Sequence, residues 1–153
     1  MLAAFSATAT IAGSPILAFV KSGDAAIDGT HVVVTNGEEL GNIVAYGDDG
    51  TDLESIAAQI QFEVDGTPGT GDMPGRIVFA TTAGGAEAAT ERMKISANGT
   101  VSLPNTSGSN LSVANTTNAT SGSTGSINTL GGLGVTGDIW CEGTVRARKA
   151  ASG

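Results

Sequence analysis

The segment GTPGTGDMPGRIVFATT, residues 66–82, places a loop rich in glycine and proline directly before an apolar run. A loop that cradles phosphate carries Gly-Lys-Ser/Thr and leads into a helix, whose N-terminus holds the anion. This loop lacks that triplet, and the residues after it, Arg76–Thr82, are β-branched and typical of a strand. The sequence therefore predicts a connection between two strands and not a phosphate site.

Catalysis by an activated nucleophile has few candidate residues. His31 is the only histidine and Cys141 the only cysteine, so a Ser-His-Asp or Cys-His arrangement would need His31. No nucleophile motif lies beside His31, which favours an ordinary histidine at a strand edge. Glycoside cleavage needs two carboxylates that meet in space, and the chain offers four candidates for it: Glu38, Glu39, Glu54 and Glu63. With one Trp, one Tyr and four Phe, aromatic platforms for a sugar are scarce, and we expect no enzyme.

Carboxylate clusters raise the question of calcium. Asp48–Asp52 and the pair Asp65 and Asp72 supply oxygen ligands, but neither follows the spacing of a helix–loop–helix calcium site. Gly131–Asp138 is similar to the calcium-binding nonapeptide of parallel β-rolls, yet Thr136 stands where that repeat needs Asp, and the unit occurs once. We expect solvated turns, no metal and no cofactor, with a weakly bound surface ion as the alternative.

Charge and hydropathy exclude two classes of partner. The net charge is −8 and only seven residues are basic, which argues against nucleic acid, because binding a polyphosphate depends on lysine and arginine. Residues 1–20 are apolar but lack a basic start, and Gly13–Pro15 interrupts them, so an export signal is the less favoured interpretation. No uninterrupted apolar run is long enough for a membrane-spanning helix, so we expect a soluble protein with no membrane partner.

The elements that would position these residues are short strands. From Ile56 to Val64 the large apolar residues alternate with Gln and Glu, which predicts a half-buried strand; a helix starting near Leu53 competes, but it leaves Phe62 exposed. Asn98-Gly99 predicts a tight hairpin with two positive-φ positions. The other expected strands are Pro15–Val20, His31–Thr35, Leu40–Tyr46, Arg76–Thr82, Glu91–Ile95 with Glu91, Met93 and Ile95 on one face, and a returning arm with Val101 and Leu103.

The sequence predicts an all-β fold in which a single copy has too few large apolar residues for a sufficient core. The 23 glycines and 4% aromatic residues leave few large side chains for a core, and oligomerisation is the usual remedy. We divide the chain into an N-terminal arm, a β-rich body, a connector rich in Ser, Thr and Asn, and a glycine-punctuated β-stem with a basic tail. Their bounds are 1–13, 14–103, 104–126 and 127–153.

Several segments of the body carry a resemblance. Ser14–Phe19, Leu40–Thr51, Val64–Gly69, Asp72–Thr82 and Glu91–Ile95 resemble, in order and spacing, a module widespread in tailed-bacteriophage fibre proteins. In the second half, the less specific segments 118–121, 124–127 and 131–139 resemble the glycine-punctuated shaft repeat of the same proteins.

The resemblance implies a virion structural protein, usually a trimer of interwoven β-strands whose apolar faces meet on a three-fold axis, and it implies no catalytic residues. On this basis three chains would bury a set of apolar residues in the body and the stem. These trimer-core candidates are Ile56, Ile60, Phe62, Ile77, Phe79, Met93, Ile95, Ile127, Leu133, Val135 and Ile139.

The sequence departs from long tail fibres in showing no receptor-binding head and no self-cleaving chaperone segment. We therefore expect a homotrimeric capsid-decorating or cement protein, or a short surface fibre, at the virion surface. Its partners would be further copies of itself and other virion proteins, foremost the major capsid protein. The alternative is a tail-fibre adhesin whose exposed loops, such as 65–75, bind a receptor or glycan of the host.

Overall fold

A computed structural model describes residues 16–24, 31–104, 111–114, 127, 129 and 133–140. The chain divides into two compact units, Met1–Leu111 and Ser112–Gly153. The predicted N-terminal arm (1–13), most of the predicted connector and the basic tail lie outside the described residues.

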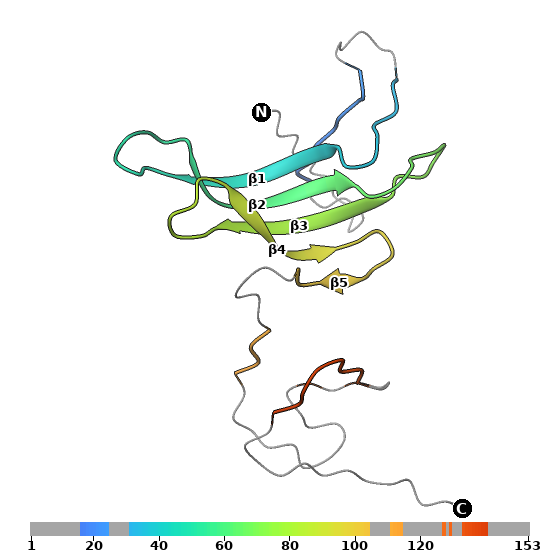
Figure 1. Cartoon of the computed structure of the whole chain (residues 1–153). Coiled ribbons are helices and arrows are strands. Elements are labelled where there is room, and N and C mark those ends of the chain that lie inside the picture. The colour runs from blue at the N-terminus through green and yellow to red at the C-terminus, as the bar shows by residue number, and fades with distance from the viewer. Residues whose placement is uncertain are drawn as a thin grey trace, which may run out of the picture. The chain divides into compact units, whose positions relative to one another are not determined.

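The first unit is a single antiparallel sheet in which every strand pairs with the next one along the chain (Figure 1). This order is a meander, which needs only hairpin connections. The described residues contain no helix, so the fold there is all-β, as predicted. The strands are β1 Glu39–Gly47, β2 Ser55–Val64, β3 Gly75–Thr82, β4 Ala89–Ile95 and β5 Val101–Ser102.

The alternation of apolar and polar residues located the strands of the sheet well. The predicted strand 56–64 is β2, and the competing helix near Leu53 is absent. The predictions for 40–46, 76–82 and 91–95 correspond to β1, β3 and β4 within two residues at each end. The glycine-rich loop 65–75 joins β2 to β3 as a hairpin connection, as expected, and Gly69 and Asp72 form a small bridge of their own inside it.

Two predicted strands are wrong. Residues 16–20 and 31–35 have no strand pairing. The Ser22 hydroxyl instead donates to the Val32 carbonyl at 3.2 Å and accepts from the Val32 N–H at 3.4 Å, and Gly23 also donates to that carbonyl. The Ser22 side chain thus takes up backbone groups of Val32 that a β-ladder would need, and both described segments have irregular backbone.

The turn between β4 and β5 also differs from its prediction. Gly99 has a φ of 81°, whereas no residue other than glycine has a positive φ in the described chain. Gly99 donates to the Ser96 carbonyl at 2.9 Å, Ser96 donates to the Thr100 carbonyl, and the Asn98 side chain accepts from the Thr100 N–H. This is a turn with one left-handed residue, followed by a bulge, and not the two-residue turn with two such positions.

A bulge in β4 changes which residues share a face. The pairing with β3 shifts between Phe79 and Ala80, so Arg92 is the extra residue and Glu91 lies opposite Ala80. Glu91 therefore shares a face with Lys94, to which it forms an ion pair at 3.6 Å, and not with Met93 as predicted. A regular strand would put residues three apart on opposite faces, so only an inserted residue permits this pair.

The register sorts the sheet into an apolar face and a polar face. Residues directly opposite each other on antiparallel strands project from the same face. The apolar face comprises Gly41, Ile43, Ala45, Ala58, Ile60, Phe62, Val64, Gly75, Ile77, Phe79, Thr81, Thr90, Met93, Ile95 and Val101 and contains no carboxylate. The bulge residue Arg92 brings one charge to it, because its Nε donates to the Thr81 hydroxyl at 3.0 Å. The polar face comprises Glu39, Asn42, Val44, Gln59, Gln61, Glu63, Arg76, Val78, Ala80, Glu91, Lys94 and Ser102.

Few side chains are fully buried. Among the described residues the buried hydrophobic residues are Val34, Val64, Val78 and Ala80, each at most 4% exposed. Val78 and Ala80 lie in the central strand on the polar face, between the longer side chains of their cross-strand neighbours. The aliphatic parts of such side chains cover small apolar residues while their polar ends reach water. The interior of one copy is therefore small, with two of its four residues on the polar face and Val64 on the apolar face.

The described part of the second unit, within residues 112–153, contains no strand. Residues 133–140 have no helix or strand and bend at Thr136 and Gly137. The predicted β-stem is thus not formed within one copy in these residues. The physical reason is that a ladder needs a second strand, and the short runs between glycines find none here.

Replacing Val64 by Ala tests how much the small interior contributes. Val64 is 0% exposed, so removing two methyl groups and leaving a cavity should lower the free energy of unfolding by about 2 kcal/mol. Urea unfolding followed by circular dichroism measures this change. Val20→Ala is the matched control, because Val20 is 93% exposed; an equal loss in both variants would contradict the burial of Val64.

Candidate interaction surface

The large apolar side chains of the sheet lie on a face that one copy leaves partly open. Ile43 and Val101 are 47% and 61% exposed. The predicted core candidates of the body are all half-buried: Ile56, Ile60, Phe62, Ile77, Phe79, Met93 and Ile95. A sheet normally buries its apolar face against a second layer, and the described residues of the first unit form only one.

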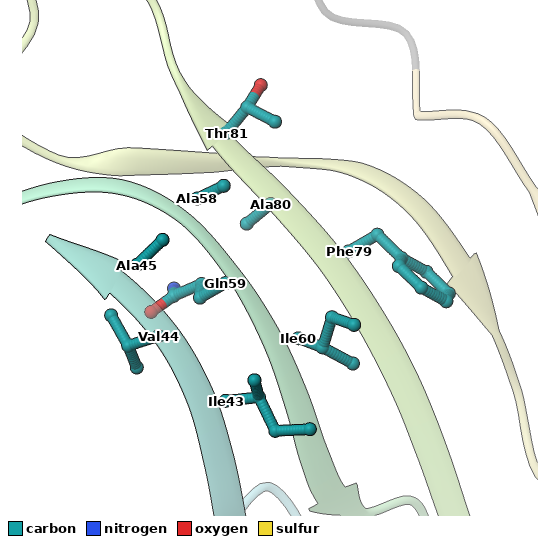
Figure 2. Close-up of a pocket in the computed structure, with 9 residues that line it drawn as sticks. All are labelled: Ile43, Val44, Ala45, Ala58, Gln59, Ile60, Phe79, Ala80 and Thr81. Carbon is teal, nitrogen blue, oxygen red and sulfur yellow. The ribbon is translucent and has the colours of Figure 1, made fainter.

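The register brings six of these seven candidates onto one face. Ile60 lies opposite Phe79 and Phe62 opposite Ile77, and β4 adds Met93 and Ile95. A shallow apolar depression crosses β1, β2 and β3 in this region (Figure 2). There, the side chains of Ile43, Ile60 and Phe79 project to one side of the strands, and those of Val44, Gln59 and Ala80 to the other.

Ile56 is not part of this cluster, and the stem candidates belong to the second unit. Between Ala45 and Tyr46 the pairing of β1 with β2 shifts by one residue, so Ile56 lies opposite Tyr46. The strict alternation predicted for β2 therefore holds only from Ala58 onward. In the second unit the stem candidates are highly exposed: Ile127 65%, Leu133 72%, Val135 45% and Ile139 66%, and the neighbouring Trp140 is 88% exposed.

A short segment, residues 16–20, packs beside the apolar face. The Phe19 ring stacks on Phe62 with 5.8 Å between ring centroids. It occupies the space above Gly41, where a Cβ atom would overlap the Phe19 side chain. The remaining gap between this segment and β1 is an apolar groove lined by Leu17, Phe19, Leu40, Ile43 and Phe62 among others. The absence of a side chain at Gly41 therefore gives Phe19 its place.

A cluster of charged and polar groups fixes one end of the sheet. Arg76 donates from Nε to Glu63 at 2.5 Å and from Nη1 to Asp65 at 3.1 Å. The other oxygen of Asp65 accepts the Ala97 N–H at 2.8 Å, which ties the β4–β5 turn to the end of β2. These hydrogen bonds hold the pKa of Asp65 below its usual value; the bond from Ala97 has the larger effect and the bond from Arg76 the smaller. Glu63, and then Asp65, raise the pKa of Arg76.

A second carboxylate holds the loop that precedes β1. Glu38 accepts from the N–H and the hydroxyl of Thr35, and it pairs with Lys21 Nζ at 3.1 Å. The Thr35 N–H, followed by Lys21, lowers the pKa of Glu38. Glu38 thereby links the segment containing Phe19 to the loop in front of β1.

Three of the five residues weighed above as catalytic candidates take part in structural hydrogen bonds or ion pairs, and the other two are exposed. Of the four glutamates, Glu38 and Glu63 are engaged as above, Glu39 accepts from Asn42 and Gln61 at 3.1 and 2.6 Å, and Glu54 is exposed. Glu39 therefore forms part of the hydrogen bonding of the polar face. His31 is exposed at the start of a described stretch.

The acidic turn between β1 and β2 uses its carboxylates on its own backbone. Asp48 accepts from the Gly50 N–H, and Asp49 accepts from Thr51, Asp52 and the Ser55 hydroxyl. These bonds, led by the Thr51 N–H, lower the pKa of Asp49. No group of three or more potential metal ligands occurs in the described part of the chain. The same part contains no helix long and apolar enough to cross a membrane.

Sequence reasoning missed four members of this surface. Ile43 and Val101 belong to the apolar face, and the alternation within their strands would have revealed them. Gly41 and Phe19 had no such signal, because nothing in the sequence relates residue 19 to residue 62.

Comparison with known proteins concerns the fold. The structure is similar to the carboxy-terminal domain of the bacteriophage T5 L-shaped tail fibre, with a TM-score of 0.55, 22% identity and coverage of 77% of this chain and 44% of that chain. A structure of that domain with its intramolecular chaperone domain gives a TM-score of 0.59, 19% identity and coverage of 90% and 33%. No protein-family model matches the chain. No curated protein matches it either.

The chain thus spans less than half the length of these tail-fibre chains. At this level of identity the likeness establishes a shared fold: an all-β fold of the kind found in phage tail-fibre domains.

Replacing Gly41 by Ala tests whether Phe19 packs in the space above Gly41. The new methyl group overlaps the ring, so Phe19 should leave Phe62, and residues 16–24 should exchange amide hydrogens at least several-fold faster. Hydrogen–deuterium exchange with mass spectrometry measures this. Gly47→Ala is the control, since Gly47 also lies in β1 but has open space around its Cβ position. Equal exchange in the two variants would refute the arrangement.

The Asp65 contacts predict a dependence of stability on pH. Because the pKa of Asp65 is lower in the folded state, its contribution is fully present above its ordinary pKa of 3.8 and is lost as the pH falls through the folded-state value. Asp65→Asn should therefore flatten the fall in melting temperature below pH 4 and lower stability at pH 7. Asp72→Asn, in the same loop, is the control; thermal melts from pH 2 to pH 7 that coincide for wild type and Asp65→Asn would contradict the prediction.

Proposed function

We propose that this chain is a non-enzymatic structural protein of a bacteriophage virion that works as a homotrimer. The observation that carries the proposal is the apolar face, a surface without carboxylates on a one-layer sheet that the described residues of one copy leave partly exposed. Exposed apolar patches of this extent mark interaction sites. Support for the viral setting comes from the similarity of the fold to tail-fibre domains of bacteriophage T5.

Further copies of the same chain are the partner that suits this face best. The chain carries a net charge of −8, so identical copies repel one another unless their contact excludes carboxylates. On the sheet, the paired carboxylates Glu39, Glu63 and Glu91 all lie on the polar face. Three apolar faces turned toward a common axis bury the large side chains and leave every one of these charges in water.

Within the virion we propose a capsid-decorating or cement trimer, or a short surface fibre, bound to other virion proteins such as the major capsid protein. The assembly would then support the particle mechanically through the apolar surface that is buried between the copies. The exposed stem residues, which form no strand in one copy, would acquire partners from the other two copies.

An adhesin is the second candidate. The β2–β3 loop projects an ordered tip, closed by the hydrogen bonds between Gly69 and Asp72 and carrying Met73 at 53% exposure. Loops held on a rigid sheet are common binding elements. A glycan array and a pull-down with host cells distinguish an adhesin, which binds, from a decoration protein, which does not.

A charge placed on the apolar face tests the trimer. Native mass spectrometry should give three times the chain mass for the wild type, whereas Ile60→Glu should give monomer or unstable protein, because a carboxylate would lie among apolar side chains. Gln59→Glu adds the same charge at the next residue, on the polar face, and should remain a trimer. A wild-type monomer that stays compact and heat-resistant at nanomolar concentration would sink the proposal.

A further inference from the structure

Both outer strands of the sheet leave one edge open. β1 pairs only with β2. β5 pairs with β4 only at Lys94 and Ile95, so the part of β4 from Ala89 to Met93 has no partner on its outer side in the described chain. Open edges present unpaired N–H and C=O groups that accept another strand.

The hydrogen-bond alternation shows which groups of β1 point outward. Val64 exchanges both of its backbone hydrogen bonds with Gly37 and Glu38, so the even-numbered residues of β2 direct their backbone groups toward β1. Ile60 is one of them and pairs with Ile43. The next residue, Val44, therefore directs its N–H and C=O away from β2, to the open edge.

The same reasoning applies to β4. Ser96 donates its N–H toward the β5 side, to Thr100, and Lys94 shares this direction and pairs with Ser102. Because the bulge inserts one residue before Met93, Glu91 has the same orientation as Lys94. Glu91 thus directs its backbone groups to the open part of the β4 edge.

Val44 and Glu91 both belong to the polar face. An antiparallel hydrogen-bonded pair places the side chains of its two residues on one face. Pairing Val44 of one copy with Glu91 of another therefore aligns polar face with polar face and continues the apolar face without interruption. A register one residue away would turn the apolar residues of one copy to the wrong side.

Strand direction also fits. Before β5 the sheet has four strands of alternating direction, an even number. Rotation about an axis along the strands keeps the direction of every strand, so β4 of one copy meets β1 of the next in antiparallel orientation. Three copies joined in this way close a ring with no open edge between them, which is how barrels remove edges.

We propose that the outer edge of β1 adds to the open edge of β4 of a second copy of this chain, with Val44 opposite Glu91. This inference rests on the three-copy assembly proposed above and names the strands that join it. Two β1 edges paired around a two-fold axis would also align the faces, but they would leave the apolar face open. The segment 16–20 lies beside β1 across a groove, and in the described chain it makes no backbone hydrogen bond to that edge.

Proline at position 44 provides the first test. Its ring removes an N–H that has no partner among the described residues and blocks strand addition, so Val44→Pro should lower the share of trimer in native mass spectrometry at least tenfold while β2 to β5 remain folded. Val44→Thr retains the N–H and should remain a trimer. A Val44→Pro protein that assembles like the wild type would overturn the edge pairing but leave the trimer standing. A wild-type monomer would overturn both.

Cross-linking provides a second test that does not depend on a destabilising variant. In a Cys141→Ser background, Val44→Cys combined with Glu91→Cys should give covalent dimers and trimers with a short bis-maleimide on a denaturing gel. Within one copy the two positions are three strands apart, roughly 14 Å, beyond a short linker. The control pair, Val44→Cys with Asn98→Cys, lies about 20 Å along the strand from the joined position and should stay monomeric. Absence of products from the first pair in a trimer of native mass overturns the register.

Discussion

The structure depends on one constraint: the sheet has a single layer, and apart from segment 16–20 the described residues place nothing against its apolar face. Burial of apolar surface is the main source of stability in a folded domain. Here the large apolar side chains of the sheet are half-buried or exposed, and the fully buried residues of the described chain are small ones such as Val64 and Ala80. We propose the oligomer because the apolar face carries more large side chains than the described residues of one copy cover.

The interior of one copy is small, and polar contacts hold the turns and one end of the sheet in a defined geometry. Asp65 joins the end of β2, the β4–β5 turn and Arg76, and Glu38 joins Lys21 to the loop before β1. Both carboxylates lie at the end of the sheet where β2 finishes, and both have lowered pKa values because backbone N–H groups donate to them. Hydrogen bonds of this kind fix the geometry of turns, whereas exposed ion pairs add little stability on their own.

The proposed function depends on the surfaces of the sheet. The carboxylates that sequence considered for catalysis or calcium hold turns and strands together, as Asp49 and Glu39 do. The two faces of the sheet differ: one is largely apolar and free of carboxylates, and the other carries an acidic and basic network. A tail-fibre-like fold with these properties is suited to assembly with copies of itself.

The sequence by itself determined the all-β class, the location of β1 to β4 and the connecting role of loop 65–75, because alternation with a period of two and clusters of Gly and Pro are local signals. The tertiary structure decided the rest. The bulge at Arg92 moved Glu91 to the other face, the Ser22 hydroxyl took up backbone groups of Val32 within the predicted strand 31–35, and Gly41 made room for Phe19. Each of these depends on a residue distant in the chain or on one inserted residue in a ladder, and no local pattern records such relations.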